Sequence, residues 1–394
     1  NALNTVNMLV ALGKSTGISP NKILASAESL YTSGLISYPR TETSQYPKNY
    51  DIQAVLDELA RHPRFGNTAK YILRNFKRPT GGKSVGDHEP ICPTKCVTET
   101  KNPMEYRIYE YVVQHFLASL MDDIEYRTVT TEIEFGSGMS NDDKVILVHQ
   151  QNIIDSIGFG PAMPWKLREI EGLGSNSEQQ VSVTSPRRDA NSSYNKPGLV
   201  SFKVNDPVSL HDIKVIDDWT NPPEFLKEHE LVHLMDENGI GTDASMAGHI
   251  ATIIDRKYVV IVDQEFKEIV HRPPGSNRPK QVGRYLVPTP LGISFVEALM
   301  KFKPNLVHPN IRAMMEAEVA QVASGALPKD VTLAKNLSWF RNEFVELRQT
   351  FASIEEMFQD RDCIYPIRQH LSMLRKRLLG MDGPSAPSSG SKTR

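Results

Sequence analysis

One short stretch constrains the fold of this chain more than any other: residues 34–46, with the sequence GLISYPRTETSQY. A helical pattern ends at Gly34, and an apolar pair follows it. Pro39 disfavours helical backbone for the residue before it, and alternate residues of an extended segment project to the same side. We therefore predict a helix-to-strand junction that presents the phenol of Tyr38 and the guanidinium of Arg40 to one place.

These two side chains form a chemically useful pair. A guanidinium near a phenol favours the ionised phenol, because opposite charges attract, and arginine is well suited to holding a phosphate. Tyr38 and Arg40 are thus interpreted as a tyrosine nucleophile beside a phosphate clamp. The alternative is an ordinary strand end with an exposed arginine, and the residues Tyr-Pro-Arg by themselves do not decide between the two.

Composition sets wide limits on the class of protein. A hydrophobic content of 39% in 394 residues supports about two or three domains with cores of their own. The net charge of −2 does not mark a nucleic-acid binder, so a basic groove would have to come from arrangement. Three cysteines make no disulfide framework, which is typical of intracellular proteins. The sequence shows no membrane-spanning apolar run and no signal-peptide pattern.

Periodicity divides the chain into three parts and a tail. Residues 1–122 have helical spacing, residues 123–219 alternate as half-buried strands do, and residues 220–379 return to helices with a short hairpin. Residues 380–394 are rich in Ser, Gly and Pro and are expected to be disordered. Because the first residue is Asn1 rather than Met, we interpret the chain as a piece or processed product of a longer protein.

The expected elements are the following. Helices are expected at about 3–12, 20–33, 51–61, 67–75, 104–120, 224–237, 242–255, 309–325 and 333–351. Strands are expected at 126–135, 145–148, 181–184, 200–204, 208–215, 258–262 and 266–271. The order helix, turn, helix and hairpin after residue 220 resembles a winged-helix unit.

A proline-flanked loop at residues 86–94 carries His88, which could contact a phosphate or carry a proton. The alternative is an exposed loop histidine without a function. A zinc site built from His88, Cys92 and Cys96 is rejected, because structural zinc needs a full set of ligands in paired short spacings. No acidic cluster suitable for a metal is evident either, so we expect no metal ligands in this chain.

Two further segments have features that could bind a phosphate. Residues 81–84, GGKS, lack the earlier glycine of a phosphate loop and are interpreted as a flexible basic loop, so a nucleotide site is not expected. The turn 238–245 precedes a helix whose N-terminus suits a phosphate. Thr242 and Ser245 could add hydroxyl donors there, with Thr242 or Asp243 as the cap. An ordinary capped helix is the alternative.

In order along the chain, four segments resemble the motifs of type IA DNA topoisomerases, in particular the topoisomerase III group. They are GLISYPRTET at 34–43, DHEPICPT at 87–94, GIGTDAS at 239–245 and PTPLG at 288–292. LNTVNM at 3–8 is similar to the family's entry into the domain that bears the tyrosine, and the resemblance extends to about residue 350. Residues 3–8, 163–165 and 241–245 are most similar to the topoisomerase IIIβ branch.

The resemblance implies a multidomain α+β fold with a type IA topoisomerase-like core. Residues 1–122 would form a helical CAP-like domain with the tyrosine, residues 123–219 part of a β-rich arch, and residues 220–379 a winged-helix-like DNA-binding domain. The implied activity is ATP-independent single-strand cleavage, strand passage and religation through a 5′-phosphotyrosyl intermediate. The resemblance assigns catalysis to Tyr38 and Arg40, and DNA contacts to His88, Thr41, Glu42, Thr242 and Ser245.

The resemblance also implies partners. Mg²⁺ is expected for the family, with ligands in a Toprim domain that nothing in this chain matches; C-terminal zinc-ribbon cysteines have no match either. Single-stranded DNA is the implied substrate, and RNA is left open. Candidate partners are an OB-fold or Tudor-type accessory protein and a RecQ-type helicase. The implied location is the nucleus, with the cytoplasm as an alternative. The alternative is a non-catalytic fragment that binds single-stranded nucleic acid. A hydrolase that uses Tyr38 is disfavoured.

Overall fold

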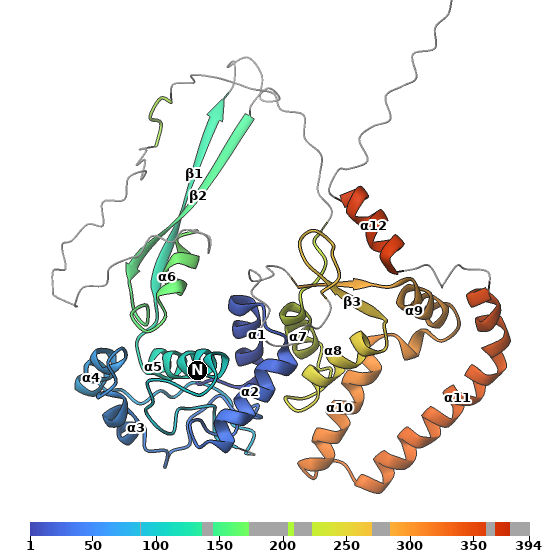
Figure 1. The fold of residues 1–394 in the computed structure, drawn as a ribbon, viewed down its shortest axis with the longest axis horizontal. Coiled ribbons are helices and arrows are strands. Elements are labelled where there is room, and N and C mark those ends of the chain that lie inside the picture. The colour runs from blue at the N-terminus through green and yellow to red at the C-terminus, as the bar shows by residue number, and fades with distance from the viewer. Residues whose placement is uncertain are drawn as a thin grey trace, which may run out of the picture.

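The computed structural model describes residues 1–86, 88–135, 145–172, 204–208, 223–269, 284–359 and 367–378. Its elements gather in a first helical region (residues 1–122), a long two-stranded ribbon, and a second helical region from residue 223 onward (Figure 1). In the described part of the chain, none of the helices has both the length and the apolar character needed to cross a membrane.

Five helices make up the first helical region, as the sequence predicts. They are α1 (Thr5–Thr16), α2 (Pro20–Thr32), α3 (Ile52–Leu59), α4 (Gly66–Arg74) and α5 (Pro103–Ser119). Their apolar faces enclose one core, and its largest fully buried side chains include Met8, Leu9, Leu12, Ile23, Leu30, Tyr109 and Phe116. The amphipathic spacing of residues 104–120 is thus confirmed as the buried face of α5, which packs against α1, α2 and α4.

The predicted helix end at Gly34 is also confirmed, and a single bridged residue follows it in place of a strand. Pro20 is the first residue of α2, after Ser19 in extended conformation. Gly34 has a φ of 67°, in the left-handed region that favours glycine. The Leu35 N–H then donates to the Leu30 carbonyl at 2.9 Å, which closes the helix. Ile36 follows in an isolated antiparallel bridge with Pro93, so this segment lies against the second motif.

The ribbon consists of β1 (Glu125–Phe135) and β2 (Val145–Ser156), which pair antiparallel along their whole length. Figure 1 shows it rising away from the first helical region, with the short helix α6 (Pro164–Ile170) near its base. The first strand lies as predicted, whereas the second is longer than the predicted 145–148. The strands predicted at 181–184, 200–204 and 208–215 fall almost wholly outside the described residues, as does the tail from 380.

The second helical region begins with α7 (Glu228–Glu237) and α8 (Met246–Asp255). After them come β3 (Val259–Val262), β4 (Tyr285–Pro288), α9 (Pro290–Phe302), the 3-10 turn η2 (Pro304–Leu306), α10 (Pro309–Ala323), α11 (Lys329–Gln359) and α12 (Ile367–Leu378). The helices expected at 309–325 and 333–351 are present, the latter extended at both ends. The sequence reasoning missed α6, α9 and α12, and α12 packs on β3 and β4 through Leu371.

In this region one predicted boundary is wrong and one predicted strand pairing is confirmed only in part. Helix α7 starts four residues later than residue 224, because Lys227 is extended and bridges Tyr285 of β4. The predicted pairing of β3 with residues 266–271 is present in part, since Glu268 bridges Val262 and the Ile269 N–H donates to the Ile261 carbonyl at 2.8 Å, whereas the strand that pairs with β3 along its length is β4. Phe266 has a φ of 56°, which interrupts an extended strand, and in the described residues after it only Glu268 bridges β3.

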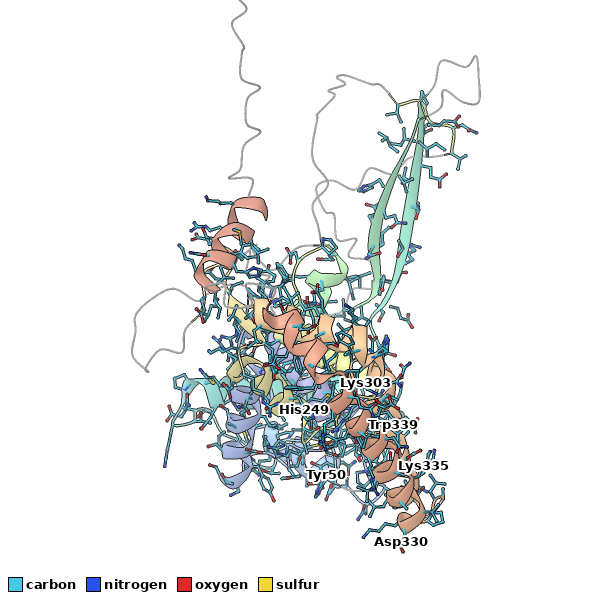
Figure 2. All side chains as sticks on the ribbon, turned by 90° about the vertical axis from the view of Figure 1, so that its right-hand side faces the viewer. Tyr50, His249, Lys303, Asp330, Lys335 and Trp339 are labelled. Carbon is cyan, nitrogen blue, oxygen red and sulfur yellow. The ribbon has the colours of Figure 1, made fainter. Side chains whose placement is uncertain are left out.

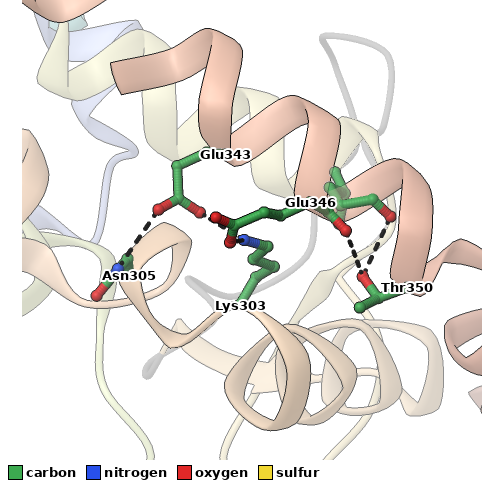
Figure 3. Close-up of polar contacts among 6 residues, drawn as sticks. Lys303, Asn305, Glu343, Glu346 and Thr350 are labelled. Atoms are coloured by element: carbon green, nitrogen blue, oxygen red, sulfur yellow. Dashed lines mark hydrogen bonds and ion pairs between the residues drawn. The ribbon is translucent and has the colours of Figure 1, made fainter. Parts of the chain in front are cut away.

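Helix α11 packs on α9 and α10 partly through polar pairs. Lys303 at the end of α9 is nearly buried and forms ion pairs with Glu343, at 3.0 Å, and with Glu346 (Figure 3). The hydrogen bond from Lys303 to Glu346 raises the pKa of the ammonium. Further along α11, Lys335 pairs with Glu318 of α10. Figure 2 shows the molecule from the side of α11, with Lys303 and Lys335 labelled.

The two helical regions touch along α1 and α7, which lie side by side in Figure 1. The helices approach closely at Gly13, where a Cβ atom would lie 2.7 Å from the Cβ of His229. Helix α2 also contacts α8. This junction brings the segment after α2 close to the turn before α8, although about 200 residues separate them in the sequence.

Candidate functional site

The backbone around Tyr38 is fastened to the first residue of α1. Thr5 is fully buried, and its hydroxyl donates to the Pro39 carbonyl at 2.7 Å. The same oxygen accepts from the Thr41 N–H at 2.8 Å, and the Thr5 N–H donates to the Thr41 carbonyl at 3.1 Å. One side chain thus satisfies polar backbone groups on both sides of Arg40. This contact gives a structural reason why residues 3–8 occur in the sequence together with residues 34–43.

The second motif fastens the same segment from its other edge. The Ser37 N–H donates to the Cys92 carbonyl at 2.9 Å, and the Cys92 N–H donates to the Ser37 hydroxyl at 2.8 Å. The Ser37 hydroxyl in turn donates to the Pro90 carbonyl at 2.7 Å. These buried bonds fix the loop that carries His88 against the segment that carries Tyr38.

A cluster of buried polar side chains packs against the contact between Ser37 and Cys92. The Cys92 side chain is fully buried, and burial raises the pKa of its thiol to about 12. Burial also raises the pKa of Tyr46, whose hydroxyl lies 2.7 Å from the Ser119 hydroxyl, and that of Tyr50. These groups therefore stay neutral near pH 7 and act as packing for the site.

Tyr38 lines an open pocket of about 560 Å³. Its ring meets the Tyr31 ring edge to face, with centroids 5.2 Å apart, and the His88 ring at 4.6 Å. The pocket is lined by Tyr31, Gly34, Ile36, Ser37, Tyr38, His88, Glu89 and Thr94. The structure therefore brings together Tyr38 and His88, as the sequence predicts. Tyr31 and Glu89, which the sequence reasoning did not single out, complete the walls.

Arg40 is not among the described residues that line this pocket. Its Nε donates to Glu28 at 2.7 Å, its Nη2 lies 2.6 Å from the same carboxylate, and its Nη1 donates to the Ala244 carbonyl at 2.7 Å. These partners hold the guanidinium, and its meeting with the Tyr38 phenol at one place stays a prediction. One N–H on each terminal nitrogen is left over.

The other two residues predicted in this segment differ in access. Thr41 is fully buried, and its hydroxyl accepts from the Thr43 N–H at 3.1 Å, so it supports the backbone instead of facing a nucleic acid. The Glu42 carboxylate is half-buried and lies 3.8 Å from the Lys83 ammonium. The loop expected to be flexible at 81–84 is paired with this segment, because the Lys83 N–H donates to the Ser44 hydroxyl at 3.0 Å.

The third motif forms the turn between α7 and α8. Helix α8 begins at Met246 with Ser245 as its cap, not with the predicted Thr242 or Asp243. The Thr242 N–H donates to the Ser245 hydroxyl at 2.9 Å, which closes the turn on itself. Both side chains are half-buried. The bond from Arg40 to the Ala244 carbonyl joins this turn to the first motif.

The fourth motif serves the packing of α9. Thr289 caps this helix by accepting from the Gly292 N–H at 3.0 Å, and its hydroxyl donates to the Lys257 carbonyl at 2.6 Å. A Cβ on Gly292 would lie 2.1 Å from the Tyr258 carbonyl oxygen, so only glycine fits this approach. A structural reason thus exists for each residue type at these positions.

A metal site does not assemble from the described residues. Among them, no three His, Cys, Asp or Glu side chains gather closely enough to hold an ion. The donor sets that Mg²⁺ prefers are carboxylate-rich, so the side chains described here do not fit a magnesium site, and no step of the chemistry below is routed through one.

Comparison with known proteins places this geometry in a family. A family model described as DNA topoisomerase matches residues 1–276. Human DNA topoisomerase 3-beta-1 and fruit-fly (Drosophila melanogaster) DNA topoisomerase 3-beta are each 32% identical over 91% of this chain, which covers 36% and 35% of their lengths. Human DNA topoisomerase 3-alpha is 28% identical over 93% of the chain and 32% of its own length.

The fold has a relative among solved structures. Full-length topoisomerase I from Thermotoga maritima matches with a TM-score of 0.50 and 18% identity, over 91% of this chain and 50% of that one. The mixed α and β, topoisomerase-like fold is thereby confirmed. The chain spans about a third of the length of the curated relatives named above. Since the family model matches well over half of its residues, the chain belongs to the type IA DNA topoisomerase family.

Proposed function

We propose that this chain carries the nucleophile of an ATP-independent enzyme that cuts and rejoins one DNA strand, and that Tyr38 is that nucleophile. The main support is the position of its ring, half-buried beside His88 in an open pocket and on a backbone fastened from two sides. A nucleophile needs a fixed approach to the reacting atom, and this backbone supplies it.

The proposed reaction conserves bonds. The Tyr38 oxygen attacks a backbone phosphorus of single-stranded DNA, and the bond from phosphorus to the 3′ oxygen breaks. The phosphate stays on Tyr38 as a 5′-phosphotyrosyl ester, the phenolic proton is lost, and the 3′ oxygen leaves as a hydroxyl after it takes up a proton. Religation reverses each step. Because one phosphate ester replaces another, the cycle needs no ATP.

Other residues would assist through hydrogen bonds. His88 is exposed next to Tyr38 and could donate to the phosphate. Arg40 would act through the two N–H groups that Glu28 and Ala244 leave over. Thr242 and Ser245 stay predicted DNA contacts: the Ser245 oxygen accepts a bond inside the turn, and both hydroxyls can still donate to a phosphate.

The wider assignments rest on the family. The domain limits at 122, 219 and 379, the arch and the winged-helix-like DNA-binding role stay predictions, and so do Mg²⁺, the accessory protein, the helicase and the nuclear location. The whole enzyme's activity is proposed from relatives of which this chain spans about a third. The competing proposal is a chain that binds single strands without cleaving them.

One assay separates these proposals. The chain is incubated with a 3′-end-labelled single-stranded oligonucleotide and Mg²⁺, denatured, and examined for a labelled covalent adduct, with a DNA and an RNA strand in parallel. We expect an adduct that Tyr38→Phe abolishes and that Tyr71→Phe, at an exposed tyrosine of α4, retains. Binding without an adduct would favour the competing proposal. The absence of both binding and adduct would contradict each of them.

A further inference from the structure

The pocket at Tyr38 is larger than a phosphate group alone would require. Its volume of about 560 Å³ falls in the range of roughly 300–1,000 Å³ that is usual for small-molecule sites. Tyr31, in the last turn of α2, is 44% exposed, and together with Tyr38 and His88 it gives the pocket three aromatic rings. Aromatic side chains are the usual platforms for unpaired bases. The walls therefore fit a flat ring system.

Glu89 gives the pocket a carboxylate acceptor, while the Lys95 ammonium lies at its edge, 3.6 Å from where a Cβ on Gly34 would stand. Glu89 is exposed and lines the pocket, and none of its described neighbours forms an ion pair or hydrogen bond with its carboxylate. A free carboxylate repels a phosphate, but it accepts hydrogen bonds from amino groups. Adenine, cytosine and guanine carry an exocyclic amino group, whereas thymine and uracil do not.

The two walls are held in place without a ligand. Pro90, next to Glu89, accepts the buried bond from the Ser37 hydroxyl, and Thr94 donates to the Gly34 carbonyl at 2.8 Å. Tyr31 itself belongs to the closing turn of α2, since its carbonyl accepts from the Gly34 N–H. A site whose walls are already ordered loses little entropy when it binds.

From these observations we infer that the pocket holds one unpaired, amino-bearing nucleobase of the strand that Tyr38 attacks. The base stacks on the Tyr31 ring, and its amino group donates to the Glu89 carboxylate. This rests on the proposed function of Tyr38, and it adds a base-recognition site next to the nucleophile. Strand cutting would then depend on the base in this pocket as well as on the backbone.

The test compares two strands that differ in one chemical group. Both are thymidine oligonucleotides with a purine at every third position, so that one purine can always reach the pocket. The purine is adenine in one strand and unsubstituted purine, which lacks only the amino group, in the other. We expect the full chain to bind the adenine strand about fivefold more tightly, as one charge-assisted hydrogen bond at a partly exposed site implies.

Two pairs of variants locate the effect. Glu89→Met should bring the affinity ratio of the two strands to about one, whereas Glu99→Met, at an exposed acid of the same loop, should change the charge equally and keep the ratio. Tyr31→Leu should weaken both strands at least about fivefold through lost stacking. Tyr71→Leu should leave both affinities unchanged. Circular dichroism of each variant verifies that it is folded.

The outcomes separate this inference from the proposed function. A ratio near one in the unmodified chain, or a ratio that survives Glu89→Met, overturns the inference while the Tyr38 adduct still supports the proposed function. A failure of both strands to bind at low salt contradicts the proposed function itself, and the inference falls with it.

Discussion

Replacing Thr5 with valine tests whether one buried hydroxyl holds the Tyr38 segment in place. Valine has nearly the same shape, but it removes the donor to the Pro39 carbonyl and the acceptor of the Thr41 N–H. Both positions are buried, and an unpaired buried polar group costs about 1–3 kcal/mol. We expect local opening of this segment to become easier by about 2 kcal/mol or more, which is roughly 30-fold in an equilibrium constant.

Amide hydrogen exchange measures this opening directly. Peptides that cover residues 37–44 report on the segment, and peptides from α5 serve as an internal standard. Thr5→Ser is the matched control, since it keeps the hydroxyl and loses one buried methyl, worth about 1 kcal/mol. The reasoning is refuted if Thr5→Val exchanges at residue 41 as slowly as the unmodified chain does, or no faster than Thr5→Ser.

Three further perturbations follow from the packing. Gly292→Ala should lower the free energy of unfolding by about 2 kcal/mol, because the new Cβ would overlap the backbone of Tyr258. Gly248→Ala, in open space on α8, should raise the free energy of unfolding by about 0.5–1 kcal/mol. Chemical denaturation of the two variants measures both effects. The thiol of Cys92 has its pKa raised from 9.0 to about 12, so stability should fall as pH rises from 9 towards 12. Cys92→Ala should flatten that slope in thermal unfolding at pH 8 and 10. Lys303→Met removes the nearly buried ion-pair partner of Glu343, so we expect a lower melting temperature of the second helical region. An unchanged melting temperature would contradict a stabilising role of this ion pair.

Local signals in the sequence account for much of the first helical region. Pro20 at the start of α2 and Gly34 beyond its end mark the limits of that helix by backbone chemistry alone. The amphipathic pattern of α5 identifies its buried face. Such features depend on residues a few positions apart, and that is why sequence reasoning finds them.

Long-range contacts were out of reach for the same reason. Arg40 is held by Glu28, and by the Ala244 carbonyl 204 residues away, and neither position carries a signal that names its partner. The strand partner of β3 was sought in the adjacent residues, which pair with it only in part, while the partner along its whole length is β4, more than twenty residues later in the chain. Tyr31 was not singled out from the sequence, because its exposure at the site is a property of the folded chain.

The buried thiol beneath the Tyr38 segment gives the molecule a chemical reporter of its own. Alkylating reagents attack the thiolate, which a fully buried cysteine with a raised pKa barely supplies. Cys96 is half-buried, and Cys363 lies outside the described residues, so serine at both positions would leave Cys92 as the sole target. The rate of Cys92 labelling would then measure how often the first helical region opens beneath Tyr38. The rate could be compared with and without a bound strand, and no dye or spin label would have to be attached beforehand.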